Sequence, residues 1–204
     1  MSERPHAEYA ERNAEPILEV LRREFRDCTR VLEIGSGTGQ HAVRFASELD
    51  HVSWQTSDLD ENHAGIRAWI AESGLRNVHD PISLDVMTAD LQAATFDGVY
   101  SSNTAHIMGF DAVVRMFTVI GKALRANGVF CLYGPFRKDG EFNTESNAMF
   151  DASLRARDAV MGIRDLEALD RLATEQSMRR TGLYAVPSNN LVAVWQKVVS
   201  NDNT

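Results

Sequence analysis

The chain has 204 residues, of which 44% are hydrophobic, so it is long enough for one domain with a core of its own. Its formal net charge of −8 at pH 7 disfavours a nucleic-acid partner, because binding to a duplex needs a basic face that neutralises phosphates. No apolar run approaches the ~20 residues that a membrane helix requires, which excludes a membrane-spanning segment.

The first predicted element is an N-terminal helix over about residues 5–25. Ile17, Leu18, Leu21 and Phe25 recur on one face at helical spacing. Pro16 lies inside this run and predicts a break or a helix start there, because proline lacks a backbone N–H and clashes with the preceding turn. The segment before it is polar and lacks the apolar stretch of a secretory signal, so we expect a cytoplasmic protein.

Strands and helices alternate from Arg30 onward. The apolar runs and turn residues predict strands over residues 31–34, 52–57, 78–84, 96–101, 129–133, 183–186 and 191–198. Helices are expected over residues 40–49, 61–73, 111–125, 145–160 and 165–177. This order predicts an α/β, doubly wound, mostly parallel sheet with helices on both faces, and the turn formers at 187–190 make the last two strands an antiparallel hairpin.

A glycine loop follows the first of these strands. The stretch RVLEIGSGTGQ places Gly35, Gly37 and Gly39 between the strand and the next helix, where glycine allows positive φ and close approach of a ligand. Ligands of such sheets bind outside the carboxyl ends of the strands. The loop is therefore the first candidate binding element.

The acid inside the first strand, Glu33, distinguishes between possible ligands of this loop. A dinucleotide fingerprint is G-x-G-x-x-G, and Gln40 stands where its third glycine belongs. A phosphate-binding P-loop needs a Lys that is absent here. A buried carboxylate repels a phosphate and is stabilised beside a cation, so Glu33 favours S-adenosylmethionine, which carries an ammonium and a sulfonium group.

Acids also follow the second and third strands. Asp58 comes after the second strand, where a carboxylate is placed to accept hydrogen bonds from both ribose hydroxyls. Asp85 follows the third strand, where it can take the adenine amino group while Val86 packs on the ring. Because these strand ends meet at one edge of the sheet, we expect the acids to surround one site.

At these residues the sequence resembles class I S-adenosylmethionine-dependent methyltransferases, over roughly residues 30–197. The matching features are VLEIGSGTG, the acid after strand two, LDV after strand three and the terminal hairpin. The resemblance implies a Rossmann-like methyltransferase fold with seven strands in the order 3-2-1-4-5-7-6, strand seven being antiparallel. It also implies three subsites for the cofactor. The methionine end would be bound by Glu33, Gly35, Ser36, Gly37 and Gly39. The ribose would be bound by Asp58 and Leu59, and the adenine by Asp85 and Val86.

Four further segments, RNAEPILEVL, GSGTGQHA, SSNTAHI and SNAMFDASLRARDAVMGIRDLEAL, resemble an uncharacterised methyltransferase-like family of bacteria and animals. This narrower resemblance supports the fold and the cofactor and implies no acceptor.

Candidates for the acceptor side lie after strands four and five. Asn103 and His106 follow strand four, and His106 is the best-placed general base. Tyr133 ends strand five and joins them as a candidate catalytic residue. The segment 137–143 that follows has no periodicity and is expected to be a lid loop. Arg12 and Asn13, on the N-terminal helix, are expected to bind either the methionine carboxylate or the acceptor, and Asn103 is also a candidate cofactor contact.

We therefore expect residues 1–204 to form one methyltransferase domain, with the N-terminal helix covering the cofactor site and a small molecule as methyl acceptor. No His, Cys or Asp residues have metal-binding spacing, Cys28 and Cys131 included, so no metal is expected. Monomer and homodimer both remain open. The alternatives are a non-catalytic sensor of S-adenosylmethionine or S-adenosylhomocysteine and, third, an NAD-dependent oxidoreductase.

Overall fold

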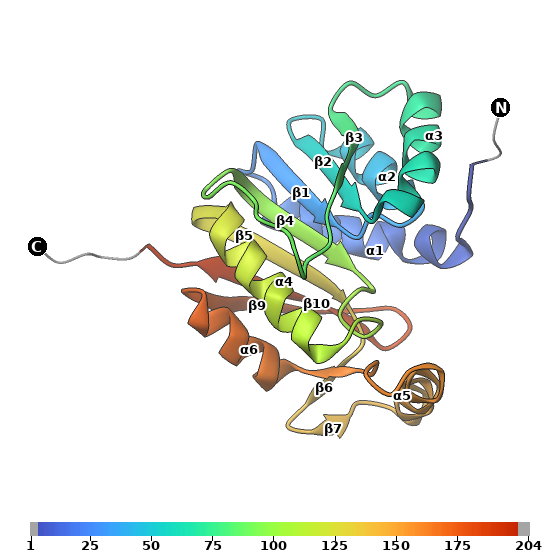
Figure 1. Ribbon diagram of the computed structural model, residues 1–204, viewed down its shortest axis with the longest axis vertical. Helices are drawn as coiled ribbons and strands as arrows, with labels where there is room; N and C mark the ends of the chain where they lie inside the picture. Colours follow the sequence, from blue (N-terminus) through green and yellow to red (C-terminus); the bar gives the residue numbers. More distant parts are fainter. Residues whose placement is uncertain (1–3, 200–204) are drawn as a thin grey trace, which may run out of the picture.

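A computed structural model of the protein describes residues 4–199, and a seven-stranded sheet forms its centre (Figure 1). The sheet order is β3-β2-β1-β4-β5-β10-β9, so the order predicted from the sequence is confirmed. Only β10 runs antiparallel to its neighbours, β5 and β9. The strands are β1 (Arg30–Ile34), β2 (Ser53–Asp58), β3 (Val78–Ser83), β4 (Phe96–Ser102), β5 (Leu124–Gly134), β9 (Met178–Val186) and β10 (Asn190–Lys197).

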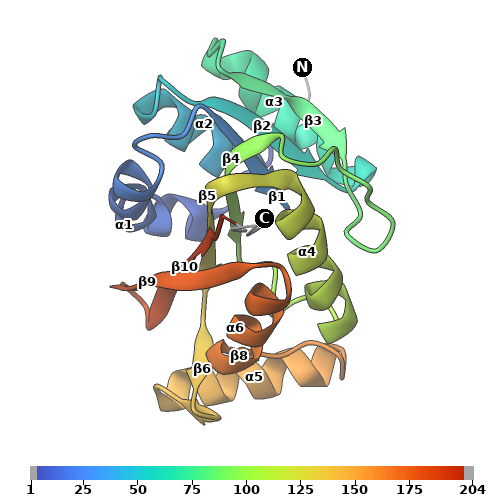
Figure 2. The ribbon, with the colours of Figure 1, turned by 90° about the vertical axis from the view of Figure 1, so that its left-hand side faces the viewer.

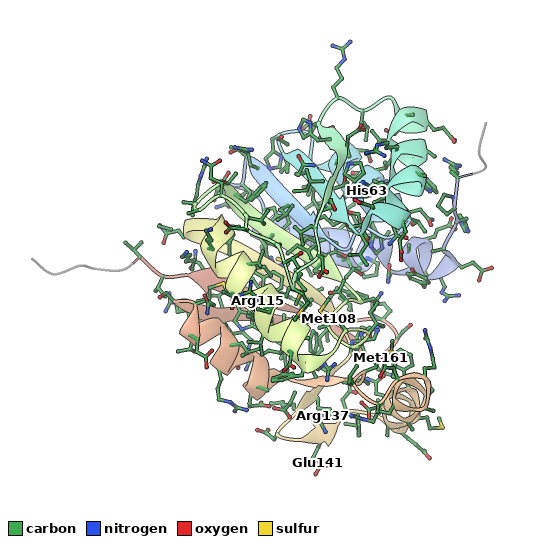
Figure 3. The ribbon with its side chains drawn as sticks, in the orientation of Figure 1. His63, Met108, Arg115, Arg137, Glu141 and Met161 are labelled. Atoms are coloured by element: carbon green, nitrogen blue, oxygen red, sulfur yellow. The ribbon has the colours of Figure 1, made fainter. Side chains whose placement is uncertain are left out.

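Helices cover both faces of this sheet, as the turned view makes clear (Figure 2). On one face, α1 (Glu8–Glu24), α2 (Gln40–Glu48) and α3 (His63–Ser73) enclose a core that includes the buried Phe45 and Trp54. On the other, α4 (Phe110–Ala123) and α6 (Leu166–Glu175) pack around Phe117 and Trp195. The short 3-10 helix η1 (Asp60–Asn62) precedes α3. In Figure 3 the side chains fill the space between these helices and the sheet.

The N-terminal helix differs from its prediction at Pro16. The break expected there is wrong, because α1 runs without interruption from Glu8 to Glu24. Ala10 and Ala14 before the proline, and Ile17 and Leu18 after it, are all buried on the same side of the helix. Packing of both halves against the domain therefore offsets the backbone hydrogen bond that proline removes.

The irregular loop expected at 137–143 is also wrong, and the role of this segment as a lid stays a prediction. This segment forms the hairpin of β6 (Phe136–Lys138) and β7 (Glu141–Phe142), and β8 (Arg164–Asp165) extends it to a second, three-stranded sheet. Arg137 and Glu141 mark this sheet in Figure 3. Strands this short carry no readable alternation, so the sequence could not reveal them. Between β7 and β8 in the chain comes α5 (Glu145–Arg157), which lies beside β7 (Figure 1).

Candidate functional site

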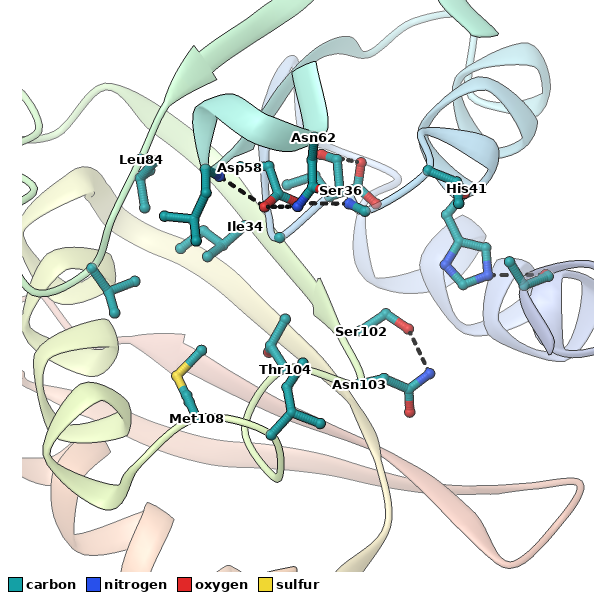
Figure 4. A pocket seen from close by; sticks show the side chains of 18 of the residues that line it. Ile34, Ser36, His41, Asp58, Asn62, Leu84, Ser102, Asn103, Thr104 and Met108 are labelled. Carbon is teal, nitrogen blue, oxygen red and sulfur yellow. Dashed lines mark hydrogen bonds between the residues drawn. The ribbon is translucent and has the colours of Figure 1, made fainter. Parts of the chain in front are cut away.

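The glycine loop and the strand ends beside it enclose a cavity of about 420 Å³, which we call the first cavity (Figure 4). Most of the residues that the sequence singled out for a cofactor line it: Glu33, Gly35, Ser36, Gly37, Asp58, Leu59, Asp85, Val86 and Asn103. The parallel strands β1, β2 and β4 bring these residues to one edge because their carboxyl ends coincide there.

Asp58 holds the loop in place. Its carboxylate accepts hydrogen bonds from the backbone N–H of Gly37 at 2.7 Å, from that of Leu59 at 2.8 Å, and from the side-chain amide of Asn62 at 2.8 Å. Gly37 has a φ of +56°, and a Cβ built on it would meet nothing within 4 Å, so the backbone is open to the cavity. A loop N–H that would otherwise be free for a phosphate is thus already taken by a carboxylate.

Glu33 lies at the back of this cavity and is only 2% exposed. It accepts hydrogen bonds from the Ser36 hydroxyl at 2.9 Å and from the Trp54 indole N–H at 3.2 Å. Burial raises the pKa of Glu33 to about 7, and these two hydrogen bonds oppose the rise only in part. No basic side chain pairs with it among the described residues, so a bound cation would relieve the cost of its charge.

Of the other residues predicted to bind the cofactor, Asp85 and Val86 line the first cavity and Gly39 does not. Asp85 lines the first cavity and accepts a hydrogen bond from the Met87 backbone N–H at 2.9 Å, and Val86 is buried beside it. Gly39 does not line the cavity: a Cβ there would lie 3.0 Å from the Ile66 backbone, which makes it a packing position between α2 and α3.

The helix α1 closes the first cavity with Tyr9 and Ala10. Two side chains of α2 hold it there. The Gln40 amide oxygen accepts a hydrogen bond from the Ala7 N–H at 2.5 Å, and His41 Nε2 lies 3.0 Å from the Ala10 carbonyl oxygen and 2.8 Å from Asn13 Oδ1. Burial lowers the pKa of His41 to about 4, so the ring is neutral near pH 7 and Nε2–H donates.

A larger, second cavity of about 850 Å³ adjoins the first, and Tyr9, Asn103 and Ile107 line both. Its wall comes from five places: α1, the loop between β4 and α4, the end of β5, helix α5 and the β9–β10 hairpin. All three predicted catalytic residues are here. Asn103 has a φ of +57° at the junction of the cavities, and its backbone N–H donates to the Tyr133 carbonyl oxygen at 2.9 Å.

His106 and Tyr133 lie in the wall of the second cavity. Burial, with a smaller effect of the Arg164 charge, lowers the pKa of His106 to about 4. The His106 ring meets Phe150 edge-on, with ring centroids 5.4 Å apart. Burial raises the pKa of Tyr133, whose hydroxyl accepts a hydrogen bond from the Asn190 amide at 2.9 Å. Near neutral pH, His106 is therefore uncharged and can accept a proton, and the Tyr133 hydroxyl is uncharged and can donate a hydrogen bond.

Arg12 and Asn13 line the second cavity and not the first. The cavity around the glycine loop therefore does not include them. Sequence reasoning missed Asn62 and His41 altogether. Asn62 lies four residues after Asp58, but the hydrogen bond from its amide to the Asp58 carboxylate is evident only in the folded structure. Among residues 4–199, no group of His, Cys, Asp and Glu has metal-binding geometry, and no helix is long and apolar enough to cross a membrane.

Several solved structures with the same fold are O-methyltransferases. An O-methyltransferase family 2 protein from Planctomyces limnophilus, in complex with apigenin, superposes with a TM-score of 0.82 at 14% identity, over 94% of this chain and 58% of that one. An O-methyltransferase family protein from Burkholderia thailandensis gives 0.80 at 12% identity, over 92% and 57%. The O-methyltransferase NcsB1 from neocarzinostatin biosynthesis, in complex with S-adenosylmethionine and 2-hydroxy-5-methyl naphthoic acid, gives 0.76 at 15%, over 93% and 55%.

The fold is thus the Rossmann-like fold of class I methyltransferases, and the chain spans between half and three fifths of the length of these neighbours. The chain itself belongs to the DUF938 family, whose model, described as "Protein of unknown function (DUF938)", matches residues 4–197.

Proposed function

We propose that this protein is an S-adenosylmethionine-dependent methyltransferase that acts on a small molecule. The observation that carries the proposal is the meeting of two unlike cavities at Asn103, one lined by acids around an open glycine loop and the other free to hold an acceptor. We further propose that DUF938 is the methyltransferase-like family that the four sequence segments resemble.

The residues of the first cavity suit S-adenosylmethionine. Glu33 is a buried carboxylate without a cationic partner, and the cofactor brings an ammonium group and a sulfonium. Asp58 and Asn62 would hold the ribose, and Asp85 and Val86 the adenine. Three carboxylates and a loop N–H already bonded to Asp58 disfavour the pyrophosphate of NAD.

The second cavity would hold the acceptor. S-adenosylmethionine supplies a methyl group on a positively charged sulfur, so an acceptor with a free lone pair needs little beyond correct positioning. Asn103, at the junction, would orient the acceptor atom. Where that atom carries a proton, neutral His106 would accept it, and Tyr133 would donate a hydrogen bond to a neighbouring oxygen.

A non-catalytic sensor is the competing proposal. It requires a cofactor cavity with no room for an acceptor beside the methyl group. The second cavity, about twice the volume of the first and sharing its wall at Tyr9, Asn103 and Ile107, favours the enzyme.

Titration calorimetry with S-adenosylmethionine, S-adenosylhomocysteine and NAD tests the cofactor. We expect the first two to bind and NAD to give no heat. NAD binding, or no nucleoside binding at all, would overturn the proposal. Incubation with labelled methyl donor and a metabolite extract then tests for transfer, with Asp58→Ala as the inactive comparison.

A further inference from the structure

Two arginines line the second cavity, and no carboxylate of the described residues does so. Arg12 comes from α1 and Arg157 from the last turn of α5. The charge of this wall is thus opposite in sign to the net charge of −8 of the whole chain. Resting on the proposed function, we propose that the second cavity binds acceptors that carry an anionic group, namely carboxylates with a flat apolar body.

Both arginines are available for a ligand. Arg157 forms no ion pair or hydrogen bond within residues 4–199, whereas its neighbour Arg155 is held by Asp151 at 2.7 Å. Arg12 meets only Glu8 Oε2, at 3.7 Å on the exposed face of α1. Exposed pairs of this kind contribute little, so a bidentate carboxylate would compete well for the guanidinium.

A third, buried positive charge lies behind the wall. Arg164 is 9% exposed and donates to the backbone carbonyl oxygens of Ala105, Met108 and Val160. These carbonyls satisfy its hydrogen bonds without cancelling its charge, and that charge is felt at His106, where it adds to the lowering of the pKa. The same field favours a negative group in the cavity.

The rest of the wall of the second cavity suits the apolar part of a ligand. Ile107, Phe150, Val186 and three prolines line it, and the uncharged polar groups of Asn103, Tyr133 and Asn190 lie among them. A cavity of about 850 Å³ has room for a two-ring molecule. Two arginines and an aromatic side chain in one cavity wall therefore suit an aryl or similarly flat carboxylate.

Three probes of matched shape test this charge preference: 1-naphthoate, 1-naphthamide and 1-naphthylmethylammonium, which are negative, neutral and positive. Each is titrated into the protein with and without saturating S-adenosylhomocysteine. We expect naphthoate to bind at least ~10-fold more tightly than naphthamide, and the cation not to bind. Equal affinity for naphthoate and naphthamide in both conditions would overturn the proposal.

Variants locate the effect. Arg157→Gln and Arg12→Gln should each reduce the preference for naphthoate, and the double variant should abolish it. Arg171→Gln, an exposed arginine of α6 outside both cavities, makes the same change in net charge and should leave the preference intact. A loss of preference in Arg171→Gln equal to that in Arg157→Gln would mean that only net charge matters, and would also overturn the proposal.

S-adenosylhomocysteine binding separates this proposal from the function on which it rests. If the nucleoside binds and naphthoate shows no preference, the methyltransferase stands and the anionic acceptor fails. If the nucleoside does not bind but the free protein still selects naphthoate through Arg157, the anion subsite stands and the methyltransferase fails.

Discussion

The two cavities share one edge of the sheet but are built in different ways. Around the first, the polar side chains bond to one another and to the backbone: Asp58 accepts three hydrogen bonds and Glu33 two. Around the second, side chains from five separate elements meet; Arg157 has no hydrogen bond or ion pair in the described chain, and the His106 ring packs edge-on against Phe150. The residues of the first cavity are therefore held by hydrogen bonds among themselves, and the second cavity presents a charged group that is not held in this way.

Their charges differ as well. Three carboxylates line the first cavity and two arginines the second. Under the two proposals above, this arrangement would draw a cationic donor and an anionic acceptor to opposite sides of Asn103. Variants of residues in both cavities test this difference.

Asp58→Ala removes the acceptor for the Gly37 and Leu59 N–H groups as well as the expected ribose contact. We expect binding of S-adenosylhomocysteine to weaken by about 100-fold, measured by calorimetry, because several hydrogen bonds to a charged group are lost together. Asp60→Ala, an exposed acid two residues away, is the control and should stay within ~2-fold of the wild type. Equal losses in both variants would contradict a specific role for Asp58.

Glu33→Gln tests the buried charge through its effect on stability. The pKa of Glu33 is about 7 in the folded protein against an ordinary value of 4.5. Between these values the native state binds more protons than the unfolded state, so the free energy of unfolding falls as pH rises through the interval. Without ligand, the glutamine variant should exceed the wild type at pH 8 by on the order of 2 kcal/mol, and the gain should vanish near pH 4.

His106 should show the opposite pH dependence, because burial disfavours the charged form of both groups and the charged form of histidine is the protonated one. Its pKa is about 4 when folded and 6.5 ordinarily, so the unfolded state binds more protons between these values and its contribution to stability falls as pH drops. Thermal unfolding of His106→Asn across pH 4–8 should show a shallower loss on the acid side than the wild type. If the stabilities of Glu33→Gln and His106→Asn, each relative to the wild type, changed with pH in the same direction, burial would not be the cause of both pKa shifts.

The first cavity could be predicted from the sequence because its chemistry is tied to strand ends. An acid in the first strand, three glycines after it, and acids after the next two strands follow from the alternation of strands and helices. The second cavity could not, because its wall combines α1, α5 and the final hairpin, whose relative positions arise only on folding. Arg157, for example, is the last residue of α5, a helix of weak hydrophobic periodicity, and nothing near it in sequence indicates a cavity.

Contacts between residues distant in sequence also explain where the sequence prediction was wrong or incomplete. Pro16 lies within a continuous helix because buried residues on both sides of it dock together. Gln40, which the sequence used only to disfavour a dinucleotide loop, accepts the hydrogen bond from Ala7 that fixes the start of α1. In each case a contact distant in sequence overrides or extends the local signal.

Glu33→Gln also sharpens the charge argument for the ligand. S-adenosylmethionine carries two positive groups and adenosine none, so the variant should lose about 10-fold in affinity for the former and less than ~2-fold for the latter. Competition titrations with both ligands at pH 8, where the wild-type carboxyl is ionised, measure the two losses. Equal losses would assign Glu33 to shaping the loop through Ser36 and Trp54, and not to cation binding.

Asn103 stands where the cavities meet, and its backbone provides the smallest test. Its φ of +57° lies in the left-handed region, which glycine adopts freely and asparagine tolerates better than alanine. Asn103→Gly should therefore change the free energy of unfolding by less than ~0.5 kcal/mol, while Asn103→Ala should cost about 1 kcal/mol. Both variants remove the same amide, so both should weaken acceptor-side ligands such as 1-naphthoate equally. If the loss of ligand binding follows the loss of stability, Asn103 only shapes the backbone between the cavities; if the two separate, its amide contacts what lies there.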